Sequence, residues 1–146
     1  MNNLPNLPCL CSSFRRTTRA LSQLYEEAMR PLGLKATQFT ILQALSLTGE
    51  ITQGRLGEIL VMDSTSLTRT LAIMVRKGWI GERRGKDRRE RWIQLTKAGK
   101  SQLAQATKLW ERVQARLKEQ LGVSTWNDLM RLTHQVTTLA ANLAAD

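Results

Sequence analysis

Apolar residues recur at intervals of three and four positions in the first part of the chain, which is the spacing of an amphipathic helix. This pattern predicts a helix that begins near Ser12 and ends at Pro31 and Gly33, with Ser12 or Ser13 as its N-cap. The predicted apolar face of this helix should pack against another part of the protein. It carries Phe14, Leu21, Leu24, Tyr25 and Ala28.

Three shorter helical patterns follow. The first covers residues 36–47, the second is capped by Thr52, and the third is capped by Asp63 and ends at Gly78. Ile51 is expected to add one short strand. The second and third helices, joined by a tight turn, form a predicted helix-turn-helix. The side chains expected to be buried are Phe39, Leu42 and Leu45 in the first helix, Leu56, Ile59 and Leu60 in the second, and Leu67, Leu71, Met74 and Val75 in the third.

Two short runs after these helices, 79–80 and 91–95, predict a pair of strands. The turn between them, 85–89, reads Gly-Lys-Asp-Arg-Arg and is rich in charge. A helix-turn-helix followed by such a ribbon is the pattern of a winged helix.

The rest of the chain predicts two long helices. Thr96 caps the first, which runs to about Gln120, Gly122 breaks it, and the second begins near Ser124 or Thr125. The apolar spacing in the first of these helices is close to that of a coiled-coil seam. The apolar positions are Leu103, Ala106, Trp110, Val113, Leu117 and Leu121, then Trp126, Leu129, Leu132, Val136, Leu139 and Leu143.

The predicted fold is therefore mainly α with a small β-wing: a winged helix-turn-helix with N- and C-terminal dimerisation helices. We expect residues 1–11 to be a flexible N-terminal segment and 12–146 to form a single unit. Within that unit, 34–97 would be the winged-helix lobe, and 12–32 and 98–146 the dimerisation helices. The end helices carry more apolar surface than one small core can use, which favours a homodimer over a capped monomer.

Charge narrows the class of partner. The chain of 146 residues has a formal net charge of +10 and a pI near 10.6. Between Arg76 and Arg91 there are eight basic and three acidic residues. Such a field points to a polyanion, with nucleic acid favoured over an acidic membrane surface. No apolar run is long enough to span a bilayer and no secretory signal is evident, so we expect a cytoplasmic protein without a membrane partner.

The third short helix has the chemistry of a recognition helix. Its outer face carries small hydroxyl side chains and Arg69, which is long enough to reach a guanine. The basic tip of the ribbon would fit a narrow minor groove. An ordinary amphipathic helix and a solvated charged hairpin are the alternatives. The candidate DNA-binding residues are Ser64, Thr65, Ser66, Thr68, Arg69, Arg76, Arg84, Lys86, Asp87, Arg88 and Arg89.

Asp87 stands out because a carboxylate next to DNA is unfavourable. We expect it to hold a neighbouring arginine side chain through a charge-assisted pair. The segment 87–99, DRRERWIQLTKAG, resembles the wing motif of the MarR (multiple antibiotic resistance regulator) family, D-x-R followed by L-T-x-x-G. Gly33-Leu34 with Thr37-Gln38-Phe39, and the segment 63–69, resemble the starts of that family's second and recognition helices.

This resemblance covers almost the whole chain from about Cys11 and implies a homodimeric winged-helix transcription regulator that binds pseudo-palindromic double-stranded DNA. It also implies that Arg89 enters the minor groove and that Asp87 positions it. Members of the family commonly bind a small lipophilic or phenolic effector between the dimerisation helices and the DNA-binding lobe. We expect the same here.

The two cysteines, Cys9 and Cys11, suggest a second kind of regulation. Cys11 is expected at a helix N-terminus near two arginines, which lowers a thiol pKa. Its position resembles that of the sensing cysteine in the organic-hydroperoxide branch of the MarR family. Tyr25 matches one tyrosine that holds the thiolate there, whereas Phe39 stands where the second is expected. The alternative is a pair of small apolar residues at a frayed end.

Catalysis has little support in the sequence. The single histidine, His134, lies far from both cysteines, and we find no nucleophile–histidine pair and no phosphate-binding glycine loop. We therefore expect no enzyme, no metal site and no cofactor. The predicted function is a sequence-specific transcription regulator, a repressor released by a small effector. The alternatives are a thiol-based redox sensor that uses Cys11 and an architectural DNA-binding protein without sequence preference.

Overall fold

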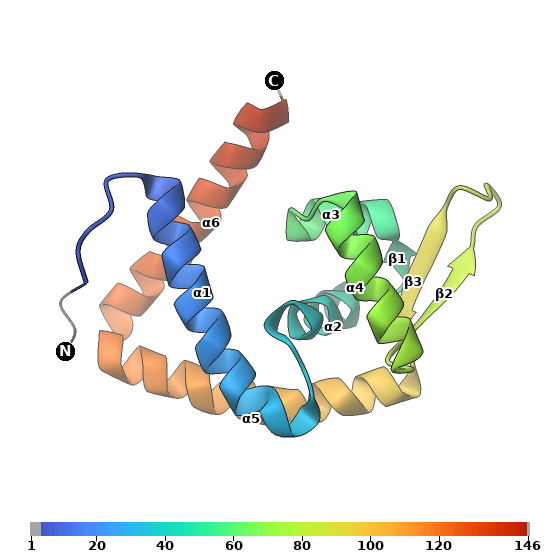
Figure 1. Ribbon diagram of the computed structural model, residues 1–146, viewed down its shortest axis with the longest axis horizontal. Coiled ribbons are helices and arrows are strands. Elements are labelled where there is room, and N and C mark those ends of the chain that lie inside the picture. Colours follow the sequence, from blue (N-terminus) through green and yellow to red (C-terminus); the bar gives the residue numbers. More distant parts are fainter. Residues whose placement is uncertain (1–3, 146) are drawn as a thin grey trace.

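The structure is a computed structural model that describes residues 4–145 (Figure 1). The helix α5 runs along the base of the molecule, with α1 and α6 at one end and the remaining helices and the sheet at the other (Figure 1). The mainly helical fold with a small wing is confirmed. Its elements are α1 (Leu10–Met29), the short 3₁₀ helix η1 (Arg30–Leu32), α2 (Ala36–Thr48), β1 (Ile51–Thr52), α3 (Gln53–Leu60), α4 (Ser64–Arg76), β2 (Ile80–Arg84), β3 (Arg91–Leu95), α5 (Lys97–Leu121) and α6 (Val123–Ala145).

The first helix begins earlier than its sequence predicts. Cys9, not Ser12 or Ser13, stands at the N-cap of α1. The Ser13 hydroxyl instead donates to the carbonyl oxygen of Leu7 over 3.1 Å, and Nη1 of Arg16 donates to that of Pro5 over 2.7 Å. These bonds hold the preceding segment against the helix start. Residues 10 and 11, which we assigned to the flexible segment, are helical, and residues 1–3 lie outside the described residues.

The core of the lobe is built around α2, the most buried helix. Phe39, Leu42 and Leu45 are buried as predicted. The prediction for Ile59 is wrong, because its side chain is 42% exposed. The helix α3 has only eight residues, and it turns Leu56 into the core while Ile59 faces outward.

The turn between α3 and α4 is tight. Val61 has φ 51°, a left-handed conformation that is costly for a β-branched side chain. Asp63 caps α4 as predicted, with Oδ1 accepting from the backbone N–H of Ser66 over 2.8 Å. Hydrogen bonds from the Ser66 hydroxyl and backbone N–H lower the pKa of the Asp63 carboxyl. The cap therefore stays charged at a lower pH than a free aspartate would.

The sheet is antiparallel with strand order β1-β3-β2. Ile51 pairs with Ile93 in β3, so the strand expected from Ile51 is confirmed. The other edge strand differs from the prediction. It begins at Ile80 and continues to Arg84, because Arg84 still pairs with Arg91 across the ribbon.

The junction between the wing and α5 explains the motif L-T-x-x-G. Oγ1 of Thr96 accepts from the backbone N–H of Gly99 over 3.0 Å and donates to the carbonyl oxygen of Gly78 over 2.5 Å. The backbone N–H of Thr96 donates to the carbonyl oxygen of Trp79 over 3.1 Å. A Cβ atom on Gly99 would overlap that same carbonyl. The motif therefore locks the start of α5 to the base of the wing.

The end helices leave much apolar surface exposed. Within the described chain, α6 has no buried residue, and Gly122 separates it from α5 with φ 82°. A groove of about 470 Å³ between α1 and α5 is lined largely by apolar side chains, among them Leu24, Val113 and Leu117. Exposed fractions lie between 42% and 66% for Leu121, Leu129, Met130, Leu132, Leu139 and Leu143.

Candidate nucleic-acid interface

The helix α4 separates its apolar and polar residues cleanly. Leu67, Leu71 and Met74 are buried against the lobe. The six candidate residues on this helix are all exposed: Ser64, Thr65, Ser66, Thr68, Arg69 and Arg76. In Figure 1, α4 lies beside the sheet, and the wing extends past it as an open ribbon. The polar face of α4 and the basic hairpin are therefore exposed next to each other.

The hydroxyl groups on this face differ in what they bind. Oγ1 of Thr68 accepts a hydrogen bond from Nε2 of Gln53 over 2.7 Å. Oγ1 of Thr70 donates to the carbonyl oxygen of Ser66 over 3.0 Å, within the helix itself. The sequence analysis did not single out Gln53, which directly follows the helix cap Thr52.

The tip of the wing is organised by Asp87, although not as predicted. Its Oδ1 accepts from the backbone N–H of Arg89 over 2.9 Å, and its carbonyl oxygen accepts from the N–H of Glu90 over 3.0 Å. Among residues 4–145 the Asp87 carboxylate forms no ion pair, so the expected pair with an arginine side chain is wrong. The short side chain of aspartate reaches its own turn more easily. Asp87 thus fixes the backbone from which the Arg89 side chain extends.

Half of the basic side chains in the segment 76–91 are used within the protein. Lys77 donates to the carbonyl oxygen of Gly33 over 3.0 Å. Nη1 of Arg84 donates to that of Arg88 over 3.1 Å, which braces the wing tip, and Arg83 and Arg91 form ion pairs. The other four basic side chains of this segment, Arg76, Lys86, Arg88 and Arg89, form no side-chain hydrogen bond or ion pair with the described residues.

Arg83 connects the wing to the turn that follows α2. Its Nε and Nη2 donate to the two carboxylate oxygens of Glu50 over 3.0 and 2.5 Å. Its guanidinium also lies 5.0 Å from the ring centre of Trp92, the residue opposite it in β3. The hydrogen bonds from Arg83 lower the pKa of the Glu50 carboxyl. No pattern in the sequence pointed to this pair.

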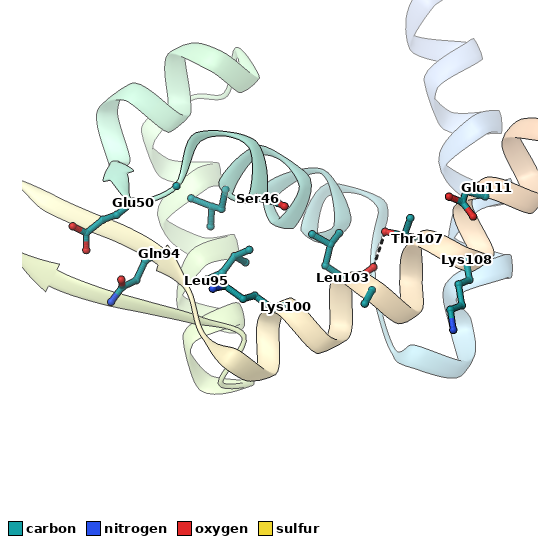
Figure 2. A pocket seen from close by; sticks show the side chains of 12 residues that line it. Ser46, Glu50, Gln94, Leu95, Lys100, Leu103, Thr107, Lys108 and Glu111 are labelled. Carbon is teal, nitrogen blue, oxygen red and sulfur yellow. Dashed lines mark hydrogen bonds between the residues drawn. The ribbon is translucent and has the colours of Figure 1, made fainter.

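Glu50 also borders a pocket of about 750 Å³ between α2, β3 and α5 (Figure 2). Glu50 and Gln94 lie at the end nearest the sheet, and Lys108 and Glu111 lie at the opposite end (Figure 2). The lining combines leucines with charged side chains. It comprises Leu45, Ser46, Gly49, Glu50, Gln94, Leu95, Lys100, Leu103, Ala104, Thr107, Lys108 and Glu111.

The two cysteines are free and exposed at the start of α1. Hydrogen bonds from Ser12 lower the pKa of the Cys9 thiol. Tyr25 lies 14 positions after Cys11, about 21 Å along the helix axis. Its hydroxyl donates to Oε1 of Gln114 over 2.6 Å, and burial raises its pKa. A single protomer therefore does not bring Tyr25 to either thiol.

Metal-binding clusters and membrane-spanning helices are both missing from residues 4–145. No group of three or more His, Cys, Asp or Glu side chains in this range is arranged to hold a metal ion. Within the same range, every helix is too short or too polar to cross a membrane.

Comparison with known proteins agrees with the resemblance. A sequence model of the MarR family matches residues 32–90. The transcriptional regulator MosR of Mycobacterium tuberculosis, in a crystal structure in complex with DNA, is 34% identical, and the match covers 90% of this chain and 98% of MosR with a TM-score of 0.77. The chain belongs to the MarR family.

Two other relatives extend the picture. A variant of MarR from Escherichia coli complexed with operator DNA is 26% identical, with a TM-score of 0.78 and coverage of 87% of this chain and 92% of that one. An uncharacterised helix-turn-helix transcriptional regulator of Bacillus subtilis (strain 168), YwoH, is 30% identical over 88 residues. That match covers 60% of this chain and 64% of YwoH. These relatives are transcriptional regulators rather than enzymes.

Proposed function

We propose that this chain is a dimeric transcriptional repressor that binds a pseudo-palindromic operator and is released by a small effector. The observation that carries the proposal is the pairing of one exposed hydroxyl-bearing helix face with a wing whose free cations gather at its tip. Backbone amides at the start of α4 would bind a phosphate, Thr65 and Arg69 would read base edges, and Arg89 would enter the minor groove.

The exposed apolar surface supports a homodimer. Leucines of α6 and the groove between α1 and α5 together form a surface that a second copy would cover. A dimer built on these helices would let two α4 helices reach successive major grooves, which lie about 34 Å apart on DNA. Sedimentation at micromolar concentration tests this: a monomer at all concentrations would contradict the dimer.

The pocket in Figure 2 is our candidate effector site. Its leucine floor suits a lipophilic body, and Lys100, which forms no ion pair in the described chain, suits an acidic group. The pocket lies between the lobe and α5, so a ligand there would favour one lobe spacing over another. Replacing Lys100 with methionine would then weaken release of DNA by a phenolic acid without weakening DNA binding itself.

Footprinting on sheared DNA from the source genome, at physiological salt, tests the main proposal. A few protected sites with two-fold symmetry are the expected result. Diffuse coverage with no shared site would contradict operator specificity and favour the architectural alternative. A control with Arg69→Ala and Arg89→Ala together should abolish the footprints while leaving the fold intact, because both side chains are exposed.

The exposed cysteines support a second candidate, a regulator that responds to oxidation. Cys9 lies at the N-cap position of α1 and has a lowered thiol pKa, and Cys11 lies in the first helical turn. Oxidation of either thiol would disturb the start of a helix proposed to form the dimer. The test compares peroxide-induced loss of DNA binding in the parent and in a variant with both cysteines changed to serine. Equal loss in both proteins would remove this candidate.

A further inference from the structure

One side-chain hydrogen bond joins the two helices of the helix-turn-helix. Gln53 is the first residue of α3, and its Nε2 donates to Oγ1 of Thr68 in the second turn of α4 over 2.7 Å. Within residues 4–145, no second hydrogen bond between side chains links α3 with α4. The partners are 15 positions apart, so tertiary structure alone brings them together.

This bond determines what the Thr68 hydroxyl offers to DNA. Threonine in a helix often donates its hydroxyl hydrogen to the carbonyl four residues earlier, as Thr70 does to Ser66. In the described chain Thr68 makes no such bond. Its oxygen accepts from Gln53, so its hydrogen remains free. Since Thr68 is exposed on the outer face of α4, it presents a donor to the outside.

We propose that Gln53 is a specificity-determining residue that acts by keeping the Thr68 hydroxyl hydrogen available as a hydrogen-bond donor. The helix would then select a base with an acceptor in the major groove at the Thr68 position. Guanine O6 and N7, adenine N7 and thymine O4 are such acceptors, whereas cytosine offers only its N4 amino donor. The inference rests on the proposed function of α4 as the reading helix. Gln53 itself is a positioning residue, because it acts through Thr68.

The surroundings of Gln53 allow this role to be tested with little disturbance. Gln53 lines a hollow of about 390 Å³ between α3, α4 and Arg91, so its side chain is not enclosed. Glutamate has the same shape as glutamine but only accepts hydrogen bonds. In Gln53→Glu the Thr68 hydrogen would turn toward residue 53, and the oxygen lone pairs would face the DNA.

The experiment measures the affinity of each protein for an operator in which every base pair of one half-site is replaced in turn. Thr68→Val, which removes the hydroxyl at constant shape, identifies the position that Thr68 reads. We expect the parent to prefer guanine or thymine over cytosine there by roughly three- to tenfold, the effect of one hydrogen bond. Gln53→Glu should move the preference toward cytosine, and Gln53→Leu should flatten it.

The comparison uses ratios between sequences, so the added charge of Gln53→Glu cancels. Gln105→Glu makes the same charge change at an exposed position of α5 and should keep the parent preferences. The proposal is overturned if both Gln53 variants retain the preference of the parent, or if Thr68→Val alters no position. A parent protein that binds all sequences equally would overturn the proposed function, and this inference with it.

Discussion

Glu50 and Arg83 form a bidentate ion pair across 33 positions of the chain, with two hydrogen bonds of 3.0 and 2.5 Å. Glu50 belongs to the turn after α2 and Arg83 to the first strand of the wing. The wing is thus attached to the lobe by a charge contact as well as by the sheet. Arg83 is also stacked near Trp92, so the contact restricts a side chain that would otherwise be free to reach DNA.

Glu50→Gln is expected to loosen the wing. The neutral amide cannot accept both charged donors of Arg83, so the ribbon should open more often. Hydrogen exchange of the backbone amides in 80–95 should become a few times faster, while exchange in α2 stays unchanged. Glu58→Gln is the matched control, because Glu58 pairs with Arg55 over 2.7 Å within one helix. Equal wing exchange in parent and Glu50→Gln would show that the sheet alone fixes the ribbon.

Acid should destabilise the protein through two carboxyl groups. The pKa of Glu50 is lowered by Arg83, and that of Asp63 by Ser66. A lowered folded-state pKa gives stability that is present above the unfolded value, about 4 for these groups, and is lost as pH falls through the folded value. The thermal midpoint should therefore drop from about pH 4 downward.

Two variants separate these contributions. Asp63→Asn keeps a capping oxygen for the Ser66 amide but no longer titrates, and Glu50→Gln removes the other group. The double variant should lose less of its thermal midpoint between pH 5 and pH 3 than the parent does. If its midpoint falls as steeply, other groups cause the acid sensitivity.

Gly99→Ala should be severely destabilising. The new methyl group would overlap the carbonyl oxygen of Trp79, which neither the helix nor the strand can easily move. We expect a loss of roughly 2–4 kcal/mol in the free energy of unfolding, measured by urea denaturation. Gly54→Ala is the control, because nothing lies within 4 Å of a Cβ there. That variant should gain up to about 1 kcal/mol from helix propensity. Similar losses in both variants would argue against a specific contact at Gly99.

Removal of single cations should affect DNA binding in two different ways. Arg89→Ala at the wing tip should weaken binding to all sequences and reduce the slope of log affinity against log salt by about one. Arg69→Ala on α4 should change which sequence is preferred. Arg30→Ala, which removes an exposed cation paired with Glu27, should do neither. If Arg69→Ala lowers affinity equally for every sequence, Arg69 does not read bases.

The sequence predicted the elements whose signals are local. The caps at Thr52, Asp63 and Thr96 are confirmed, because a cap links residues only two or three positions apart. The first cap was wrong, because the helix already begins at Leu10 and Ser13 lies inside it, with its hydroxyl donating to the carbonyl of Leu7. Ile59 was wrong for a related reason: a helix of eight residues is too short for its apolar spacing to define the buried side.

The contacts that organise the candidate interface could not be predicted from the sequence. Gln53 meets Thr68, and Glu50 meets Arg83, only after the lobe has folded, and no periodic pattern connects these positions. The family motif was visible, but its physical meaning was not. The reason for a glycine at position 99 appears only when the carbonyl of Trp79 is placed beside it.

The helix α5 is a single rod of 25 residues, about 37 Å long, fixed at one end to the wing and ending in the exposed apolar region. A rod of this length amplifies small rotations. A tilt of 10° at the far end would move the wing by about 6 Å, nearly two base-pair steps of DNA. If two such rods cross in a dimer, their crossing angle would determine the distance between the two wings and therefore the operator spacing that the dimer can bind. A ligand would then need to change that angle by only a few degrees for the two DNA-binding lobes to stop matching the two half-sites of the operator.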